Sequence, residues 1–241
     1  MPEKINGAIQ NQLSHSGNPL KKYQYSVIGR SSIKDLILYE MFTLFCIPAS
    51  GKAGVMLRRL GLPIVSAQIG KSVTIGRDNF ILQPHKLYLG NNVTVGDKVT
   101  FGIKPDGERI VLSDNVSVGD RTIFNCTGAV VMIGKGTRIA NDCRLGSLKE
   151  LTVGSFCNIG QFTCISGASH TYSGLDKPII QQSIISKGPT IIEDNVRIGE
   201  HVTILEGVHI GENSTIADYS LVNKDVPPHS LVAGTPAQVC G

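Results

Sequence analysis

The chain has 241 residues and a formal net charge of +4, with Lys and Arg scattered along it and not interleaved with aromatic residues. This pattern argues against a nucleic-acid-binding surface, and the length is sufficient for one domain and an appendage. The six cysteines form no CxxC pair, which indicates reduced thiols in a cytoplasmic protein and no zinc site.

Residues 1–31 are rich in Asn, Gln, Ser and Gly, and the composition predicts a poorly ordered N-terminal tail. Residues 32–66 are more apolar and predict a helical arm. Ser32 is placed to cap a helix over 33–45, and a second helix is expected over 54–60 with Arg58 and Arg59. We expect these helices to cover the open end of the domain that follows. The alternative is contact with a membrane surface through residues 33–60, at the inner face of the membrane.

Residues 67–226 follow a six-residue period. The period is incompatible with a helix of 3.6 residues per turn, but it suits short strands separated by corners. Three such strands make one triangular coil, and stacked coils make a parallel β-helix of about seven coils. The 21 positions on the period are all Ile, Leu, Val or Phe: Ile69, Ile75, Ile81, Leu89, Val95, Phe101, Leu112, Val118, Phe124, Ile133, Ile139, Leu145, Val153, Ile159, Ile165, Ile192, Ile198, Ile204, Ile210, Ile216 and Val222.

The spacing between coils locates one long loop. Successive coils begin at 69, 89, 112, 133, 153, 192 and 210, so their spacings exceed three six-residue steps by 2, 5, 3, 2, 21 and 0. All the extra residues fall at the same corner, and the long loop over 166–190 is the only large insertion. Long loops on rigid scaffolds often carry function. His170 lies in this loop, and a neutral imidazole can take a proton from a hydroxyl or an amine near neutral pH.

The motifs in the second half of the chain are EDNVRIG at 193–199, ILEGVHIG at 204–211, SLVNKDVPP at 220–228 and VAGTPA at 232–237. Together they resemble the hexapeptide-repeat acyltransferases, most closely the maltose/galactoside O-acetyltransferases and the O-acetyltransferases of exopolysaccharide and O-antigen gene clusters. The resemblance covers about 69–237 and implies an all-β, left-handed parallel β-helix. Residues 227–241 form a separate C-terminal segment in this interpretation.

The resemblance also implies an activity. Such enzymes are homotrimers that bind acetyl-CoA, without a metal, in clefts between neighbouring prisms and transfer the acetyl group to a saccharide acceptor. His170 matches the general base, and the expected acetyl-CoA contacts are Glu200, Asp218, Asn223 and Lys224. The expected acceptor contacts are Asp142 and Asp176.

Several interpretations stay open at this point. One base serves a hydroxyl and an amine equally, so N-acetylation of an amino sugar or an antibiotic is the alternative reaction. Asp218 and Tyr219 stand where the family has a small Ala-Gly pair, and this departure favours a non-catalytic trimeric scaffold. A γ-class carbonic anhydrase would need three suitably spaced histidines, which the sequence does not offer.

Overall fold

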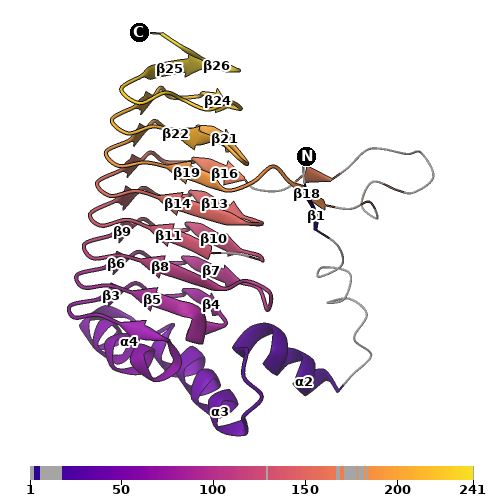
Figure 1. The fold of residues 1–241 in the computed structure, drawn as a ribbon. Coiled ribbons are helices and arrows are strands. Elements are labelled where there is room, and N and C mark those ends of the chain that lie inside the picture. Colours follow the sequence, from indigo (N-terminus) through magenta and orange to yellow (C-terminus); the bar gives the residue numbers. More distant parts are fainter. Residues whose placement is uncertain are drawn as a thin grey trace.

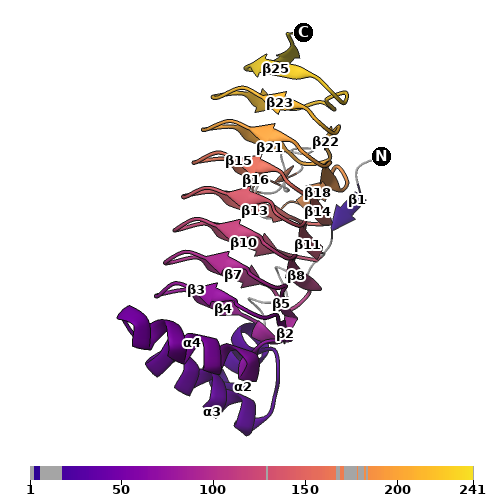
Figure 2. The same ribbon diagram turned by 90° about the vertical axis from the view of Figure 1, so that its left-hand side faces the viewer.

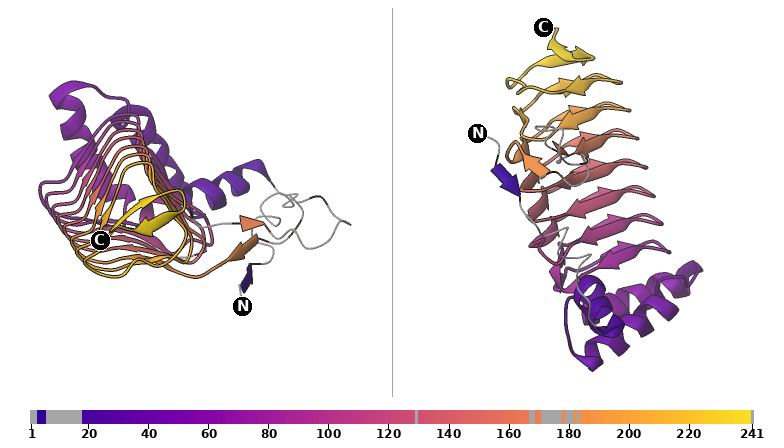
Figure 3. Two further views of the ribbon diagram at one scale, coloured as in Figure 1. Left: turned by 90° about the horizontal axis from the view of Figure 1, so that it is seen from above. Right: turned by 90° about the vertical axis from the view of Figure 1, so that its right-hand side faces the viewer.

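A computed structural model describes residues 3–5, 18–128, 130–166, 169–170, 178, 182 and 184–240. Short parallel strands stack into a three-sided prism, with helices at its N-terminal end (Figure 1). Seen along its axis, the prism is a triangle (Figure 3). The predicted parallel β-helix of about seven coils with a helical arm is confirmed.

Three parallel sheets form the sides of the prism, and each coil contributes one strand to each sheet. The first sheet contains β2 (Gln68–Ile69), β5 (Leu87–Leu89), β8 (Arg109–Leu112), β11 (Val130–Ile133), β14 (Glu150–Val153), β19 (Thr190–Ile192) and β22 (His209–Ile210). The second contains β3 (Thr74–Ile75), β6 (Thr94–Val95), β9 (Ser117–Val118), β12 (Arg138–Ile139), β15 (Asn158–Ile159), β20 (Arg197–Ile198), β23 (Thr215–Ile216), β25 (Leu231–Gly234) and the antiparallel β26 (Ala237–Val239). The third contains β4 (Phe80–Leu82), β7 (Thr100–Ile103), β10 (Ile123–Cys126), β13 (Arg144–Ser147), β16 (Cys164–Ser166), β21 (Thr203–Leu205) and β24 (Leu221–Val222).

The six-residue period forms the core. Of its 21 positions, 20 are buried and Ile69 is partly buried against the same cluster, so the period selects the inward side chain of each strand. The parallel register stacks one coil on the next, as Ile139 on Ile159 and Ile159 on Ile198. Cys143 and Cys157 are also buried in this core.

The parallel stack continues beyond the seventh coil, although the step from Val222 to Val226 is four residues and not six. Val226 forms a parallel bridge with Ile210, and Val232 pairs with Ile216. These two residues begin an incomplete eighth coil, and the hairpin of β25 and β26 ends the stack. The expected boundary between residues 226 and 227 therefore falls inside this last coil.

The helical cap consists of α2 (Pro19–Tyr23), the π-helix η1 (Gln24–Ile28), α3 (Ile33–Met41), the π-helix η2 (Phe42–Cys46) and α4 (Gly51–Val65). Ser32 caps α3 as expected, since its hydroxyl accepts from the Lys34 N–H at 3.2 Å. The expected helix over 54–60 is too short: α4 begins at Gly51 and continues through Pro63, because Leu62 and Val65 are buried against the prism. No helix among the described residues is long and apolar enough to cross a membrane.

The cap closes the edge of the first coil, which has no preceding coil to bond its carbonyl groups. Arg58 is only 3% exposed and donates from Nε to the Ile75 carbonyl at 2.8 Å. Tyr39 donates its hydroxyl to the Ile81 carbonyl at 2.9 Å, and burial raises its pKa to about 12. Exposed strand edges invite pairing with other chains, and these two side chains block two sides of the prism. Arg58 is therefore a buried residue that bonds the cap to the prism, whereas its sequence neighbour Arg59 is exposed.

Residues 18–31 differ from the expected tail. Asn18 caps α2, and Ile28 at the end of η1 is only 2% exposed. The Gln83 N–H donates to the Val27 carbonyl at 2.6 Å, which ties this segment to the first coil. Composition did not predict this contact because the partner, Gln83, lies far from this segment in the sequence.

Candidate functional site

The long loop leaves the prism where the third sheet turns into the first, and part of it forms a small separate sheet. In this sheet, β18 (Ile184–Ser186) lies between β17 (Ser169–His170) and β1 (Glu3–Ile5), and both pairings are antiparallel. His170 pairs with Ile184 across β17 and β18. The small sheet stands to one side of the prism (Figure 1), as the turned view in Figure 2 also shows. The backbone of His170 is therefore held by strand pairing outside the prism, and Asp176 lies outside the described residues.

A buried carboxylate anchors the returning end of this loop. Glu206 follows β21 and is 7% exposed, and it accepts hydrogen bonds from the Ser186 hydroxyl and from the Lys187 N–H at 3.1 Å. The Ser186 hydroxyl also accepts from the Gly188 N–H at 3.1 Å. Burial raises the pKa of Glu206, while these hydrogen bonds oppose the shift. Glu206 thus fixes the strand that pairs with His170 to the body of the prism.

Two predicted cofactor contacts lie one coil further along the same edge. Asn223 and Lys224 directly follow β24 and are exposed. The pairing of Ile204 with Val222 places Lys224 next to Glu206 in the stack. Lys187 is also exposed and lies against Gly207. The edge where the loop emerges therefore carries two ammonium groups on neighbouring coils.

Glu200 and Asp218 lie instead on the edge between the second and third sheets. The Asp218 Oδ1 accepts the Glu200 N–H at 2.9 Å, and Glu200 Oε1 accepts from Gln161 at 3.3 Å. The same carboxylate-to-backbone bond recurs lower on this edge, where the Asp120 Oδ1 accepts the Asp97 N–H at 2.8 Å. Asp218 therefore has a structural role at its corner, in the position where a small residue was expected from the family.

Asp142 is on this second edge as well, and it is engaged in an ion pair. Its Oδ1 and Oδ2 accept from Nε and one terminal nitrogen of Arg121 at 2.7 and 2.6 Å. The hydrogen bond to Arg121 lowers the pKa of Asp142. A carboxylate with a lowered pKa is a weak base, so this geometry favours acceptor orientation over proton abstraction for Asp142.

An aromatic stack continues the same edge and was not found from the sequence. The rings of Phe162 and His201 lie 4.7 Å apart, and those of His201 and Tyr219 lie 4.8 Å apart. Each of these three residues lies at a corner of its coil and has left-handed backbone geometry, with φ between 55° and 59°. The signal was present, since His201 and Tyr219 are separated by three six-residue steps, and residues one full coil apart share an edge. The bulk of Tyr219 is thus held in a stack along the edge.

The structure therefore divides the predicted residues into two groups. His170, Asn223 and Lys224 belong to the loop edge, whereas Asp142, Glu200 and Asp218 belong to the opposite edge of the third sheet. A strand of this sheet separates the two edges by roughly 15 Å, at about 3.3 Å per residue. One protomer does not bring all six residues together.

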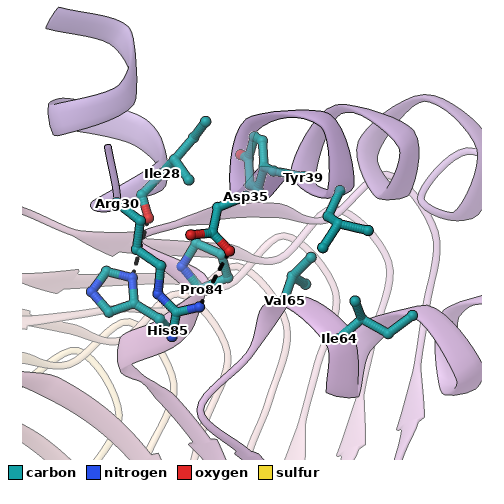
Figure 4. A pocket seen from close by; sticks show the side chains of 9 residues that line it. Ile28, Arg30, Asp35, Tyr39, Ile64, Val65, Pro84 and His85 are labelled. Carbon is teal, nitrogen blue, oxygen red and sulfur yellow. Dashed lines mark hydrogen bonds and ion pairs between the residues drawn. The ribbon is translucent and has the colours of Figure 1, made fainter. Parts of the chain in front are cut away.

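A further polar cluster lies between the cap and the first coil (Figure 4). Arg30 and Asp35 form an ion pair at 3.5 Å, and the His85 Nδ1 donates to the Ile28 carbonyl at 3.1 Å. Burial and the nearby Arg30 lower the pKa of His85. These contacts fasten η1 to the prism. Within the parts of the chain that the structure describes, no group of three or more His, Cys, Asp or Glu is placed to hold a metal ion.

Comparisons with known proteins agree with the repeat and the fold. Residues 189–224 match the model of the bacterial transferase hexapeptide family (six repeats), which confirms the predicted resemblance for this segment. A 54-residue stretch is 56% identical to 2,3,4,5-tetrahydropyridine-2,6-dicarboxylate N-acetyltransferase of Clostridium perfringens, and 50% identical to the enzyme of that name from Staphylococcus aureus. Each match covers 22% of this chain and 23% of the relative, so the chain spans about a quarter of these relatives' length.

A solved structure extends the likeness over most of the prism. A variant of AntD, an N-acyltransferase from Bacillus cereus in complex with dTDP and coenzyme A, has a TM-score of 0.53 and 21% sequence identity. The match covers 80% of this chain and 89% of AntD. At this identity the match supports a shared fold.

Proposed function

We propose that the protein is an acyl-CoA-dependent acyltransferase that moves an acetyl group from acetyl-CoA to a hydroxyl group of a saccharide. The observation that supports this most is the loop edge, where β18 pairs with the strand of His170 and leads into exposed Lys187, and the neighbouring coil carries exposed Lys224. Lysine ammonium groups suit the phosphates of a CoA molecule, so the residues present on this edge fit it. The hexapeptide match and the fold agree with this reaction class.

His170 performs the proton transfer in this mechanism. Acetyl-CoA, when bound, supplies the activated acyl thioester. His170 takes the proton from the acceptor hydroxyl while the acceptor oxygen forms its bond to the acyl carbon. As the carbon–sulfur bond breaks, the imidazolium returns the proton to the leaving thiolate. Asp142 and Asp176 orient the acceptor, and Asn223 and Lys224 hold the CoA moiety together with Glu200 and Asp218.

The two separated groups of residues favour a site shared between protomers. If three prisms pack side by side, the loop edge of one protomer lies beside the opposite edge of its neighbour, and both groups then face one cleft. We therefore propose a homotrimer. Light scattering at micromolar concentration should give three times the 25.8 kDa mass of the chain. A monomer at that concentration would argue against a shared site.

N-acylation is the second candidate, because both the 54-residue match and AntD are named as acting on nitrogen. The same base and the same co-substrate would serve an amine. Calorimetric titration with acetyl-CoA, followed by a panel of saccharides with free hydroxyl groups and matched amino sugars, separates the candidates. Transfer to the hydroxyl panel supports the first proposal, and transfer only to amines supports the second. No acetyl-CoA binding at all would favour a scaffold, with Tyr219 closing the cofactor path.

We propose that the reaction takes place in the cytoplasm. The chain has six cysteines, and Cys143 and Cys157 are buried in the core of the prism. Thiols in this number are typical of a reducing compartment. Activity in a cytoplasmic extract, but not in a periplasmic one, would agree with this placement.

A further inference from the structure

The outer side of the helical cap is apolar where a solvent-facing helix surface is normally polar. On α4, Met56, Leu60 and Ile64 follow one another at four-residue spacing, and on α3, Ile33, Ile37 and Met41 do the same. These six side chains are between 52% and 70% exposed. We call them the apolar end face.

The middle of each stripe points away from the prism, whereas Ile64 at the end of α4 also lines the pocket of Figure 4. Successive residues of a helix turn by about 100°, so positions two apart lie on opposite sides. Met56 and Leu60 are each two positions from Arg58, which bonds the first coil. Ile37 and Met41 are each two positions from Tyr39, which also bonds the first coil. The apolar end face is therefore the outer surface of a helical layer that closes the end of the prism (Figure 2).

The charge around this face is strongly positive. Residues 18–66 contain seven Lys or Arg and two acidic residues, a net charge of +5, whereas the whole chain has +4. The rest of the chain therefore has a net charge of −1. Of the seven Lys and Arg residues only Arg58 is buried against the prism, so the surface of the cap carries a net charge of +4. The two acidic residues are engaged within the cap, Asp35 with Arg30 at 3.5 Å and Glu40 with the Tyr23 hydroxyl at 2.6 Å. The cap carries the excess positive charge of the molecule beside its apolar surface.

We infer that the apolar end face docks on the surface of an anionic lipid bilayer. Apolar side chains enter the boundary between headgroups and acyl chains, and the flanking lysines and arginines meet the lipid phosphates. A second copy placed end to end would bring a surface charge of +4 against +4, which charge repulsion opposes. Side-by-side packing of prisms leaves the ends uncovered, and a trimer would present three such faces in one plane. This inference does not depend on the catalytic proposal.

Flotation of the full chain with lipid vesicles tests the inference. One set of vesicles is phosphatidylcholine alone, and the other contains phosphatidylcholine and phosphatidylglycerol. We expect flotation with the anionic vesicles, weakened at about 0.5 M NaCl because salt screens the charges. Leu60→Glu and Ile37→Glu should each lower the partition coefficient at least about tenfold, since each adds a charge to the inserted surface. The matched control is Phe156→Glu, a 64% exposed aromatic on the prism, which should float like the wild type.

A charge variant tests the second part of the inference. Lys34→Glu combined with Lys52→Glu should lower flotation with anionic vesicles at least about tenfold and leave the melting temperature unchanged. Equal flotation with neutral and anionic vesicles, or equal loss with Phe156→Glu, would overturn the inference. So would an absence of flotation. If light scattering then showed an assembly of twice the expected mass that Leu60→Glu splits, the end face would be covered by a second copy.

Discussion

Replacing Arg58 with Ala should destabilise the first coil and its cap, because one buried side chain bonds four carbonyl groups. Nε donates to Ile75 at 2.8 Å, and one terminal nitrogen contacts the carbonyls of Cys46, Ile47 and Ala49 at 3.0, 3.2 and 2.6 Å. The first carbonyl belongs to the prism and the other three to the turn before α4. Arg58 thus joins the cap to the repeat.

The magnitude follows from three N–H groups that donate to these carbonyls. A hydrogen bond to a charged group contributes about 1.5–3 kcal/mol, and the lower value gives roughly 4.5 kcal/mol for the three. Water entering the vacated space recovers part of this, so we expect a loss of about 3 kcal/mol. For a chain of this size, about 2–4 °C per kcal/mol gives a decrease in melting temperature of roughly 10 °C.

Circular dichroism melting and hydrogen exchange provide the assay. Because each coil of a solenoid contacts only its neighbours, the amides of residues 74–82 should exchange faster before the rest of the prism does. Arg59→Ala is the matched control, since Arg59 is the exposed neighbour of Arg58, and it should change stability by less than about 0.5 kcal/mol. If Arg58→Ala had the same melting temperature as Arg59→Ala, and the amides of the first coil stayed protected from exchange, the assignment of Arg58 as the cap residue would be refuted.

Two further predictions concern the loop edge. Lys224→Ala should weaken acetyl-CoA binding by about 1–3 kcal/mol and raise the KM for acetyl-CoA more than the KM for the acceptor, and calorimetry that finds unchanged affinity would move the phosphate site to Lys187 or Arg197. Glu206 has a raised pKa in the folded state, so the folded state holds more protons than the unfolded state and this contribution to stability is lost as pH rises through the folded-state pKa. We therefore compare the melting temperatures of the wild type and Glu206→Gln at several pH values. The wild-type melting temperature minus that of the variant should fall as the pH rises from below about 4.5. A difference that does not change with pH would contradict a buried Glu206 that binds a proton in the folded state.

The repeat was predictable from sequence because its cause is local. Each inward side chain must stack on the one a full coil away, so the period survives in the sequence and marks 20 buried positions correctly. Counting the residues between successive coils also predicted that all the loops lie on one edge of the prism. Ser32 was predictable for a similar reason, since a cap bonds an N–H only two residues away.

The contacts between distant segments were not predictable in this way. The inward direction of Arg58 depends on the free carbonyl of Ile75, which appears only once the first coil is built. The pairing of Asp142 with Arg121 requires the register of two coils, as does the bond between Glu206 and Ser186 across the loop. The resemblance supplied residue types for the site, but the division of those residues between two edges required the three-dimensional stack.

The kinetics of His170→Ala test the central claim most directly. The account predicts that kcat falls by about 10²–10⁴, the usual contribution of a positioned base, while acetyl-CoA affinity and the melting temperature stay near the wild-type values. The pH–rate profile should also lose the acid limb that imidazole protonation produces. His229→Ala, which removes an exposed histidine from another corner, should leave kcat unchanged. A His170→Ala protein that turns over its best acceptor at the wild-type rate would contradict the account and leave the loop without a catalytic role.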